Sequence, residues 1–155
     1  MIWVFGVLLT LLLGSFVLLR LLMRGHIKER HTIEIDGTAV AVEYRYGSKL
    51  PKFLGVGGTT INETLCFRAY PRRWRREIYG VRNVSKELVA HELGHVIDKH
   101  RKGFVRYWKA ALWEIVTKRS HDDRMFERRA SAYAILLLAG KAEGIIVGTA
   151  LSGFE

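Results

Sequence analysis

The sequence predicts an α+β fold, with a small antiparallel sheet followed by helices and preceded by one apolar helix of membrane-spanning length. Three observations favour this fold. Residues 2–19 contain no charged side chain, residues 31–70 are rich in strand-forming patterns, and apolar residues recur at helical spacing after Ser85. With 155 residues, 49% of them hydrophobic, the chain is about one domain long and can supply a folded core. This composition excludes an intrinsically disordered chain.

The N-terminal segment IWVFGVLLTLLLGSFVLL, residues 2–19, is predicted to be a membrane anchor. As a helix rising about 1.5 Å per residue it would cover roughly 27 Å, close to the hydrocarbon thickness of a bilayer. A cleaved signal peptide is the competing interpretation, but no basic residue precedes the apolar run and no clear small-x-small cleavage site follows it. We therefore expect residues 1–23 to form an uncleaved transmembrane anchor and residues 24–155 to form a single folded domain.

Basic residues follow the apolar segment and set its predicted orientation. They all lie on its C-terminal side: Arg20, Arg24, Lys28 and Arg30. The positive-inside rule therefore places the domain in the cytoplasm, as part of a single-pass membrane protein. A formal net charge of +10 suits contact with anionic lipid headgroups. The single cysteine, Cys66, cannot form a disulfide within the chain and leaves the redox compartment open.

The sheet is predicted within residues 31–70. In HTIEIDGTAVAVEYRYG, residues 31–47, apolar and polar side chains alternate on both sides of Asp36-Gly37, which indicates a β-hairpin. Residues 59–70 are enriched in Thr, Ile, Leu, Phe and Tyr and predict a third strand. The glycines of FLGVGG, residues 53–58, lack the spacing of a phosphate-binding loop, so we expect them to form a turn.

Three helices are predicted in the second half of the chain. Ser85 is a suitable N-cap for a helix that runs to about His100. The spacing of apolar side chains predicts a second helix over residues 105–119 and a third over residues 124–139. Residues 134–154 are expected to form a buried helix end followed by a glycine-rich tail.

The segment VAHELGHVID, residues 89–98, contains the pattern His-Glu-x-x-His. His91 and His95 fall one turn apart on one face of the predicted helix, so both imidazoles can reach a single metal ion. Glu92 lies beside the first histidine, where it can take a proton from a water that the metal activates. The alternative interpretation is a pair of helix histidines satisfied by hydrogen bonds in the core.

A catalytic zinc requires a third protein ligand and one open position. The metzincin pattern is excluded, because Asp98 stands where its glycine should be and Arg101 where its third histidine should be. His100 is one residue away from that position and is not expected to reach the metal from the same helix. The better candidate is Glu127, in FERRASAYA, residues 126–134.

The motifs HELGH and ERRASAYA together resemble those of the gluzincins, zinc metallopeptidases whose third ligand is a glutamate on a later helix. The closest likeness is to minimal, single-domain members, in which a small adjacent sheet offers an edge strand to the substrate. The resemblance covers about residues 31–139 in the order of elements. It implies a zincin-like fold, Zn²⁺ held by His91, His95 and Glu127, and hydrolysis of a peptide or protein substrate with Glu92 as general base.

Two features depart from the gluzincin pattern. Many gluzincins carry an aspartate four residues after the glutamate ligand to orient a zinc-bound histidine, whereas this chain has Ser131. Asp98, one turn beyond His95, could take over that role by accepting the free ring N–H. No residue is an unambiguous stabiliser of the oxyanion formed during peptide hydrolysis; Tyr133 and His121 are candidates by residue type.

Small side chains near the proposed ligands support close packing of the two helices. Ala130 and Ala134 share the predicted helix face of Glu127, and Gly94 offers clearance on the helix that carries the histidines. The alternative interpretation of Glu127 is a solvated carboxylate paired with nearby arginines.

The segment RAYPRRWRREIYGVR, residues 68–82, holds six arginines against one acid, with aromatic residues between them. Headgroup contact or a solvated loop is the favoured interpretation, and nucleic-acid binding is less favoured because no recognised motif accompanies it. The sequence as a whole therefore predicts a membrane-anchored zinc metallopeptidase. Two alternatives remain: a non-catalytic, membrane-tethered regulatory or binding module of the same fold, and a basic nucleic-acid-binding protein.

Overall fold

The computed structural model describes residues 2–71, 84–117, 124–152 and 154, except for the side chains of residues 2–6, 8 and 9. Eleven elements follow one another along these residues. They are α1 (Ile2–Leu22), β1 (Ile27–Ile35), β2 (Thr38–Tyr46), α2 (Lys49–Leu54), β3 (Gly58–Ile61), β4 (Thr64–Phe67), α3 (Lys86–Lys102), α4 (Phe104–Thr117), α5 (Met125–Leu138), β5 (Ile145–Ile146) and the 3₁₀ helix η2 (Gly148–Leu151). The fold is α+β, as expected.

The predicted hairpin is confirmed. β1 and β2 pair antiparallel along their whole length, from Ile27 opposite Tyr46 to Ile35 opposite Thr38. The turn residues Asp36 and Gly37 both have positive φ, 50° and 78°, as a tight two-residue hairpin turn requires.

The predicted third strand and the all-antiparallel sheet are corrected. Two strands, β3 and β4, take the place of the single strand predicted over residues 59–70, and they form a second antiparallel hairpin with Asn62 at positive φ in its turn. β4 pairs with β2 in parallel, so the five-stranded sheet is mixed, in the order β3-β4-β2-β1-β5. The parallel pairing is reached through α2, a short crossover helix capped by Ser48 and ended by Gly55.

The three predicted helices after Ser85 are confirmed as α3, α4 and α5. Ser85 caps α3 by accepting a hydrogen bond from the Leu88 amide at 3.2 Å. The C-terminal tail contains a strand that the sequence did not predict. β5 pairs with the outer edge of β1, and the residues after it return Ala150, Leu151 and Phe154 to the core.

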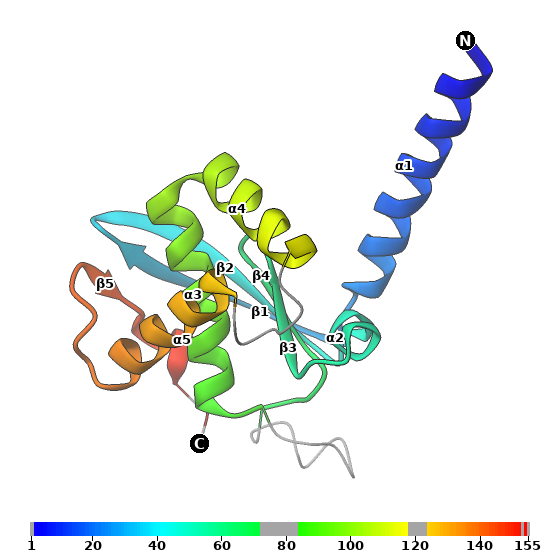
Figure 1. Ribbon diagram of the computed structural model, residues 1–155. Helices are drawn as coiled ribbons and strands as arrows, with labels where there is room; N and C mark the ends of the chain where they lie inside the picture. The colour runs from blue at the N-terminus through cyan, green and yellow to red at the C-terminus, as the bar shows by residue number, and fades with distance from the viewer. Residues whose placement is uncertain (1, 72–83, 118–123, 153, 155) are drawn as a thin grey trace.

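The main core lies between one face of the sheet and helices α3 and α5 (Figure 1). Alternate residues of the strands and one stripe of α3 supply it. The largest fully buried apolar side chains are Tyr44, Tyr46, Phe67, Ile33, Ile35, Leu65, Leu93 and Ile97. The face of α3 next to this core stripe carries the two motif histidines, so the sheet fixes the direction in which they point.

The predicted membrane anchor is corrected. α1 is the apolar helix expected from the sequence, and it extends away from the rest of the protein (Figure 1). Among the helices of the described residues, none is both long enough and apolar enough to cross a membrane. The transmembrane helix over residues 1–23 is therefore wrong, and so is the single-pass location with a cytoplasmic domain.

The base of α1 is tied to the domain. Ser48 Oγ donates to the carbonyl of Leu22 at 2.9 Å, and Met23 packs against Leu50 and Cys66 in a small separate core. Burial raises the pKa of the Cys66 thiol to about 11.

Residues 72–82 of the arginine-rich segment lie outside the described residues, so the alternatives for that segment stay predictions.

Candidate metal centre

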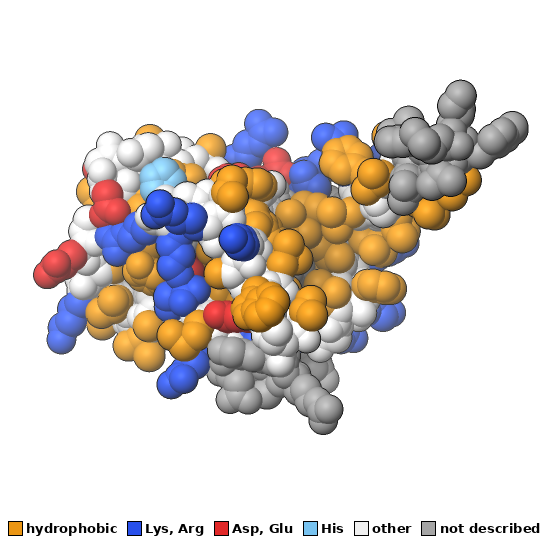
Figure 2. Space-filling view, turned by 45° about the horizontal axis from the view of Figure 1, so that its top comes forward, with side chains coloured by type: hydrophobic (Ala, Val, Ile, Leu, Met, Phe, Trp, Pro, Cys, Tyr) orange, Lys and Arg blue, Asp and Glu red, His pale blue; other side chains and the backbone are white. Residues whose placement is uncertain are grey.

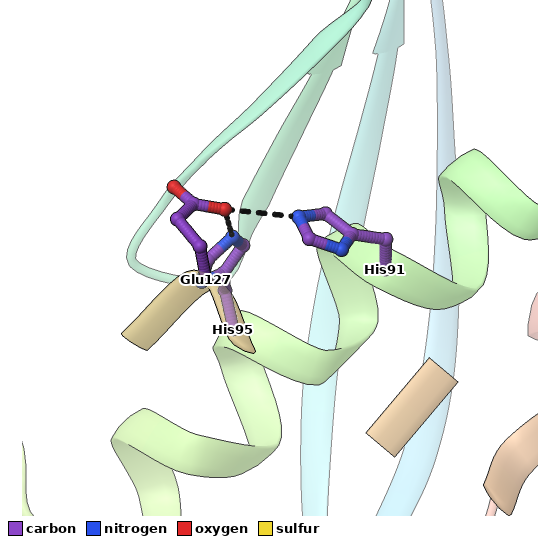
Figure 3. A group of neighbouring side chains, drawn as sticks. All are labelled: His91, His95 and Glu127. Atoms are coloured by element: carbon purple, nitrogen blue, oxygen red, sulfur yellow. Dashed lines mark hydrogen bonds and ion pairs between the residues drawn. The ribbon is translucent and has the colours of Figure 1, made fainter. Parts of the chain in front are cut away.

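Three side chains converge where α3 meets the first turn of α5. His91 and His95 lie one turn apart on α3, with ring centroids 4.9 Å apart. Glu127 enters from α5, and its Oε2 lies 3.1 Å from His91 Nε2 and 3.3 Å from His95 Nε2 (Figure 3). The helix spacing and the later glutamate therefore meet in space as the sequence predicted.

These separations fit a tetrahedral metal site. Zinc binds imidazole nitrogen and carboxylate oxygen at about 2.0–2.2 Å, which places neighbouring ligand atoms of a tetrahedron roughly 3.3–3.5 Å apart. The two nitrogen-to-oxygen distances are close to that value, and one ligand atom from each residue lies within 4.8 Å of the others. His91, His95 and Glu127 can therefore hold a metal ion. Glu127 and His95 are each 8% exposed, whereas His91 is part-buried at the open side of the group.

The second nitrogen of each histidine ring contacts a hydroxyl group. His91 Nδ1 lies 3.2 Å from Ser131 Oγ, and His95 Nδ1 lies 3.1 Å from Tyr107 Oη. A histidine that binds metal through Nε2 carries its proton on Nδ1, so both hydroxyl oxygens would then accept a hydrogen bond. Ser131 thus occupies the place where many gluzincins have an aspartate.

Asp98 does not orient His95, contrary to that expectation. Its carboxylate is 2% exposed and bonds Lys102 at 2.9 Å and Arg129 at 3.0 Å. This buried group joins α3 to α5 through its ion pair with Arg129. Tyr107, from α4, takes the position beside His95 instead.

Close contact between α3 and α5 brings Glu127 to the histidines. Gly94 lies between the two histidines on α3 and faces Ala130 of α5. A Cβ added at Gly94 would lie 2.8 Å from the Ala130 Cα and nearer still to its carbonyl oxygen. The expectation of small residues at this crossing is confirmed, because no larger side chain fits between the backbones.

Glu92 lies beside the ligand group and is 3% exposed. Thr60, on β3, donates a hydrogen bond to Glu92 Oε2 at 2.6 Å, and its hydroxyl also lies 3.1 Å from the backbone carbonyl of Glu92. Burial raises the pKa of Glu92, although His95 and the Thr60 hydrogen bond oppose the shift. Thr60 was not predicted, because no pattern in the sequence pairs a strand threonine with a residue about thirty positions later.

The pKa of His91 is also shifted. Burial lowers it, but the hydrogen bond that the ring donates to Glu127 and the negative charges of Glu92 and Glu127 outweigh burial, so the net pKa is raised. The two histidines and the two carboxylates thus form one electrostatically coupled group.

A cavity of about 570 Å³ opens onto this group. It is lined by residues 57–61, including β3, and by residues of α2, α3, α4 and the start of α5. The described side chains that line it with the ligand group include Leu54, Val56, Leu88, Trp108, Ile115 and Phe126. The volume is in the range of about 300–1,000 Å³ that ligand sites have.

Neither predicted oxyanion stabiliser is placed at the site. Tyr133 does not line the cavity: its hydroxyl lies 3.5 Å from Arg101 Nη1, and its ring lies under that guanidinium. His121 lies outside the described residues. Arg124 does line the cavity, and its Nε is buried with no hydrogen-bond partner in the described part of the chain. Arg124 is the N-cap residue of α5, and its place in the cavity lining was not predicted from the sequence.

No protein family model matches this chain, and no similar protein is found among the curated proteins or the solved structures. Functional inference therefore rests on the geometry of the site.

Proposed function

We propose that the protein is a zinc-dependent peptidase of gluzincin type. The observation that carries this proposal is the convergence of His91, His95 and Glu127 beside the buried carboxylate of Glu92, at the wall of a cavity bordered by an edge strand. Three protein ligands leave one coordination position open, which distinguishes catalytic zinc sites from structural ones with four ligands.

The ligand set favours zinc. Two imidazole nitrogens and one carboxylate oxygen form a combination found in catalytic zinc sites, whereas magnesium and calcium prefer sites built from oxygen ligands. Zinc supplies Lewis acidity at such a site, since it polarises a carbonyl and makes water a nucleophile near neutral pH.

Glu92 has the position of a general base. It adjoins His91 on α3 and lines the same cavity, yet it is not one of the three converging ligand residues. Its carboxylate would take the proton of the attacking water and deliver it to the amine that leaves. Thr60 holds one carboxylate oxygen by a 2.6 Å hydrogen bond, which fixes the side chain and leaves the other oxygen for the proton.

β3 can bind the main chain of a substrate. Among the described residues β3 pairs only with β4, so its other edge has backbone groups free for a further strand. Residues 57–61 line the cavity. An extended peptide paired with this edge would present its carbonyl groups towards the metal ligands, by the β-strand addition used in several peptide-binding proteins.

Metal content of the full-length protein tests the ligand assignment. Elemental mass spectrometry of the wild type should find about one zinc per folded chain, which a Glu127→Ala variant should lose or hold far more weakly. Glu143→Ala, at an exposed glutamate that does not line the cavity, is the matched control and should keep its zinc. Zinc retained equally by both variants would remove Glu127 from the ligands.

Hydrolysis tests the catalytic assignment. The zinc-loaded wild type should cleave members of a mixed peptide pool, followed by mass spectrometry, and Glu92→Gln should keep zinc but cleave none of them. Zinc binding without any cleavage by the wild type would contradict the peptidase and favour a non-catalytic module.

A further inference from the structure

The cavity beside the metal ligands has an apolar wall contributed by several elements. Leu54 comes from α2, Trp108 and Ile115 come from α4, and Phe126 comes from α5. The same cavity is lined by residues 57–61, which offer mainly backbone and small side chains. A peptide placed along β3 would therefore have its main chain against the strand and alternate side chains directed into the apolar wall.

Charged groups are few on this wall. Apart from the ligand group and Glu92, the only charged side chain among the described lining residues is Arg124. The formal net charge of +10 is therefore carried mainly by residues that do not line the cavity. The positive charge of the whole chain can attract acidic partners. It does not determine which side chains the cavity prefers to bind.

The apolar wall continues to the surface at the mouth of the cavity. Leu54 and Ile115 line the cavity while remaining 52% and 45% exposed. Hydrophobic side chains also cover much of the face seen in Figure 2, beside the base of α1. When a ligand covers exposed apolar side chains at the mouth of a cavity, their removal from water contributes favourably to the free energy of binding.

We propose that the cavity selects extended segments that carry bulky apolar side chains next to the bond to be cleaved. This inference rests on the proposed peptidase and names its substrate class. Such segments are exposed in unfolded chains and apolar linkers, and buried in folded proteins. The backbone of β3 would accept any sequence, so the selection comes from α2 and α4.

Peptide binding by the inactive enzyme tests this preference without requiring catalysis. The probes are three fluorescein-labelled peptides, blocked at both ends and identical except at their central positions, which are apolar (Leu and Phe), neutral polar (Ser and Gln) or acidic (Asp and Glu). Zinc-loaded, full-length Glu92→Gln protein should bind the apolar peptide roughly tenfold or more tightly than either other peptide, as burial of one large apolar side chain predicts. Fluorescence anisotropy at physiological salt measures the three dissociation constants.

A matched pair of variants tests whether the cavity wall causes the preference for apolar peptides. In the Glu92→Gln background, Ile115→Ser should weaken the apolar peptide by roughly tenfold and leave the polar peptide unchanged. Val116→Ser makes a similar polarity change one residue away, at a side chain that is 82% exposed and does not line the cavity, and should bind as the parent does. Trp108→Leu, which keeps an apolar residue in the wall, should also weaken the apolar peptide.

The outcomes separate the two proposals. Tighter binding of the acidic peptide, or equal behaviour of Ile115→Ser and Val116→Ser, would overturn the apolar preference. Apolar binding that depends on Ile115, with no cleavage of that peptide by the wild type, would support the preference and contradict the peptidase.

Discussion

Two hydroxyl groups on different helices contact the second ring nitrogen of His91 and of His95. Ser131 Oγ lies beside Nδ1 of His91, and Tyr107 Oη lies beside Nδ1 of His95. Residues that accept the free ring N–H of a metal-binding histidine fix its tautomer and orientation, and their loss weakens metal binding. These two residues therefore connect the site to α5 and α4, beyond the helix that carries the histidines.

Removal of either hydroxyl should weaken zinc binding. Tyr107→Phe and Ser131→Ala are each expected to raise the zinc dissociation constant by roughly 10- to 100-fold, since the ring N–H loses its acceptor. Competition with a chelating dye measures the constant in the full-length protein. Tyr133→Phe removes a hydroxyl from the same helix as Ser131 but next to Arg101, and should change nothing. An unchanged constant for both site variants would show that the rings need no such support.

Site residues that lie close together in the sequence could be predicted from their spacing. Site residues that only the fold brings together could not. His91, Glu92 and His95 follow from one helical turn, and the resemblance supplied Glu127. Thr60 reaches Glu92 from a strand, and Tyr107 reaches His95 from α4. No periodicity in the chain records either contact, so neither was predictable.

The candidate site depends on the close crossing of α3 and α5. Gly94 and Ala130 bring the two backbones together. The sequence indicated this crossing through its small residues, and it indicated the first hairpin through its turn. It did not reveal the parallel pairing of β4 or the two-residue strand β5, because pairing partners and very short strands leave no pattern of their own.

A methyl group at the crossing should separate the two helices. Gly94→Ala is expected to lower the free energy of unfolding by about 1–3 kcal/mol through overpacking, and to weaken zinc binding because Glu127 moves away from the histidines. Urea denaturation followed by circular dichroism measures the first effect.

Gly14→Ala is the control for this prediction. Gly14 is also a helical glycine, and an added Cβ there meets nothing within 4 Å. The substitution should be neutral or slightly stabilising, because alanine favours a helix by up to about 1 kcal/mol over glycine. A similar result for both variants would mean that the crossing tolerates extra volume.

A bound metal would join parts of the fold that are distant in the sequence. The candidate ligands come from α3 and α5, which also pack together at Gly94 and through the Asp98–Arg129 ion pair. A ligand that binds only the folded chain stabilises it in proportion to the logarithm of its concentration.

Zinc should therefore raise the melting temperature of the full-length protein. At a hundred times its dissociation constant, zinc contributes about 2.7 kcal/mol. For a chain of this size that corresponds to a shift of roughly 5–10 °C, measured by differential scanning calorimetry. Magnesium should give no comparable shift, because it prefers oxygen ligands. A zinc-induced shift that persists in Glu127→Ala would place the stabilising metal elsewhere on the chain.

The hydroxyl of Thr60 touches Glu92 twice, at the side chain and at the backbone carbonyl. This hydroxyl therefore links the strand that would bind a peptide to the carboxylate that would act as the general base. A displacement of β3 would therefore reach Glu92 through the Thr60 hydroxyl, so that occupancy of the strand edge and the placement of the base would change together.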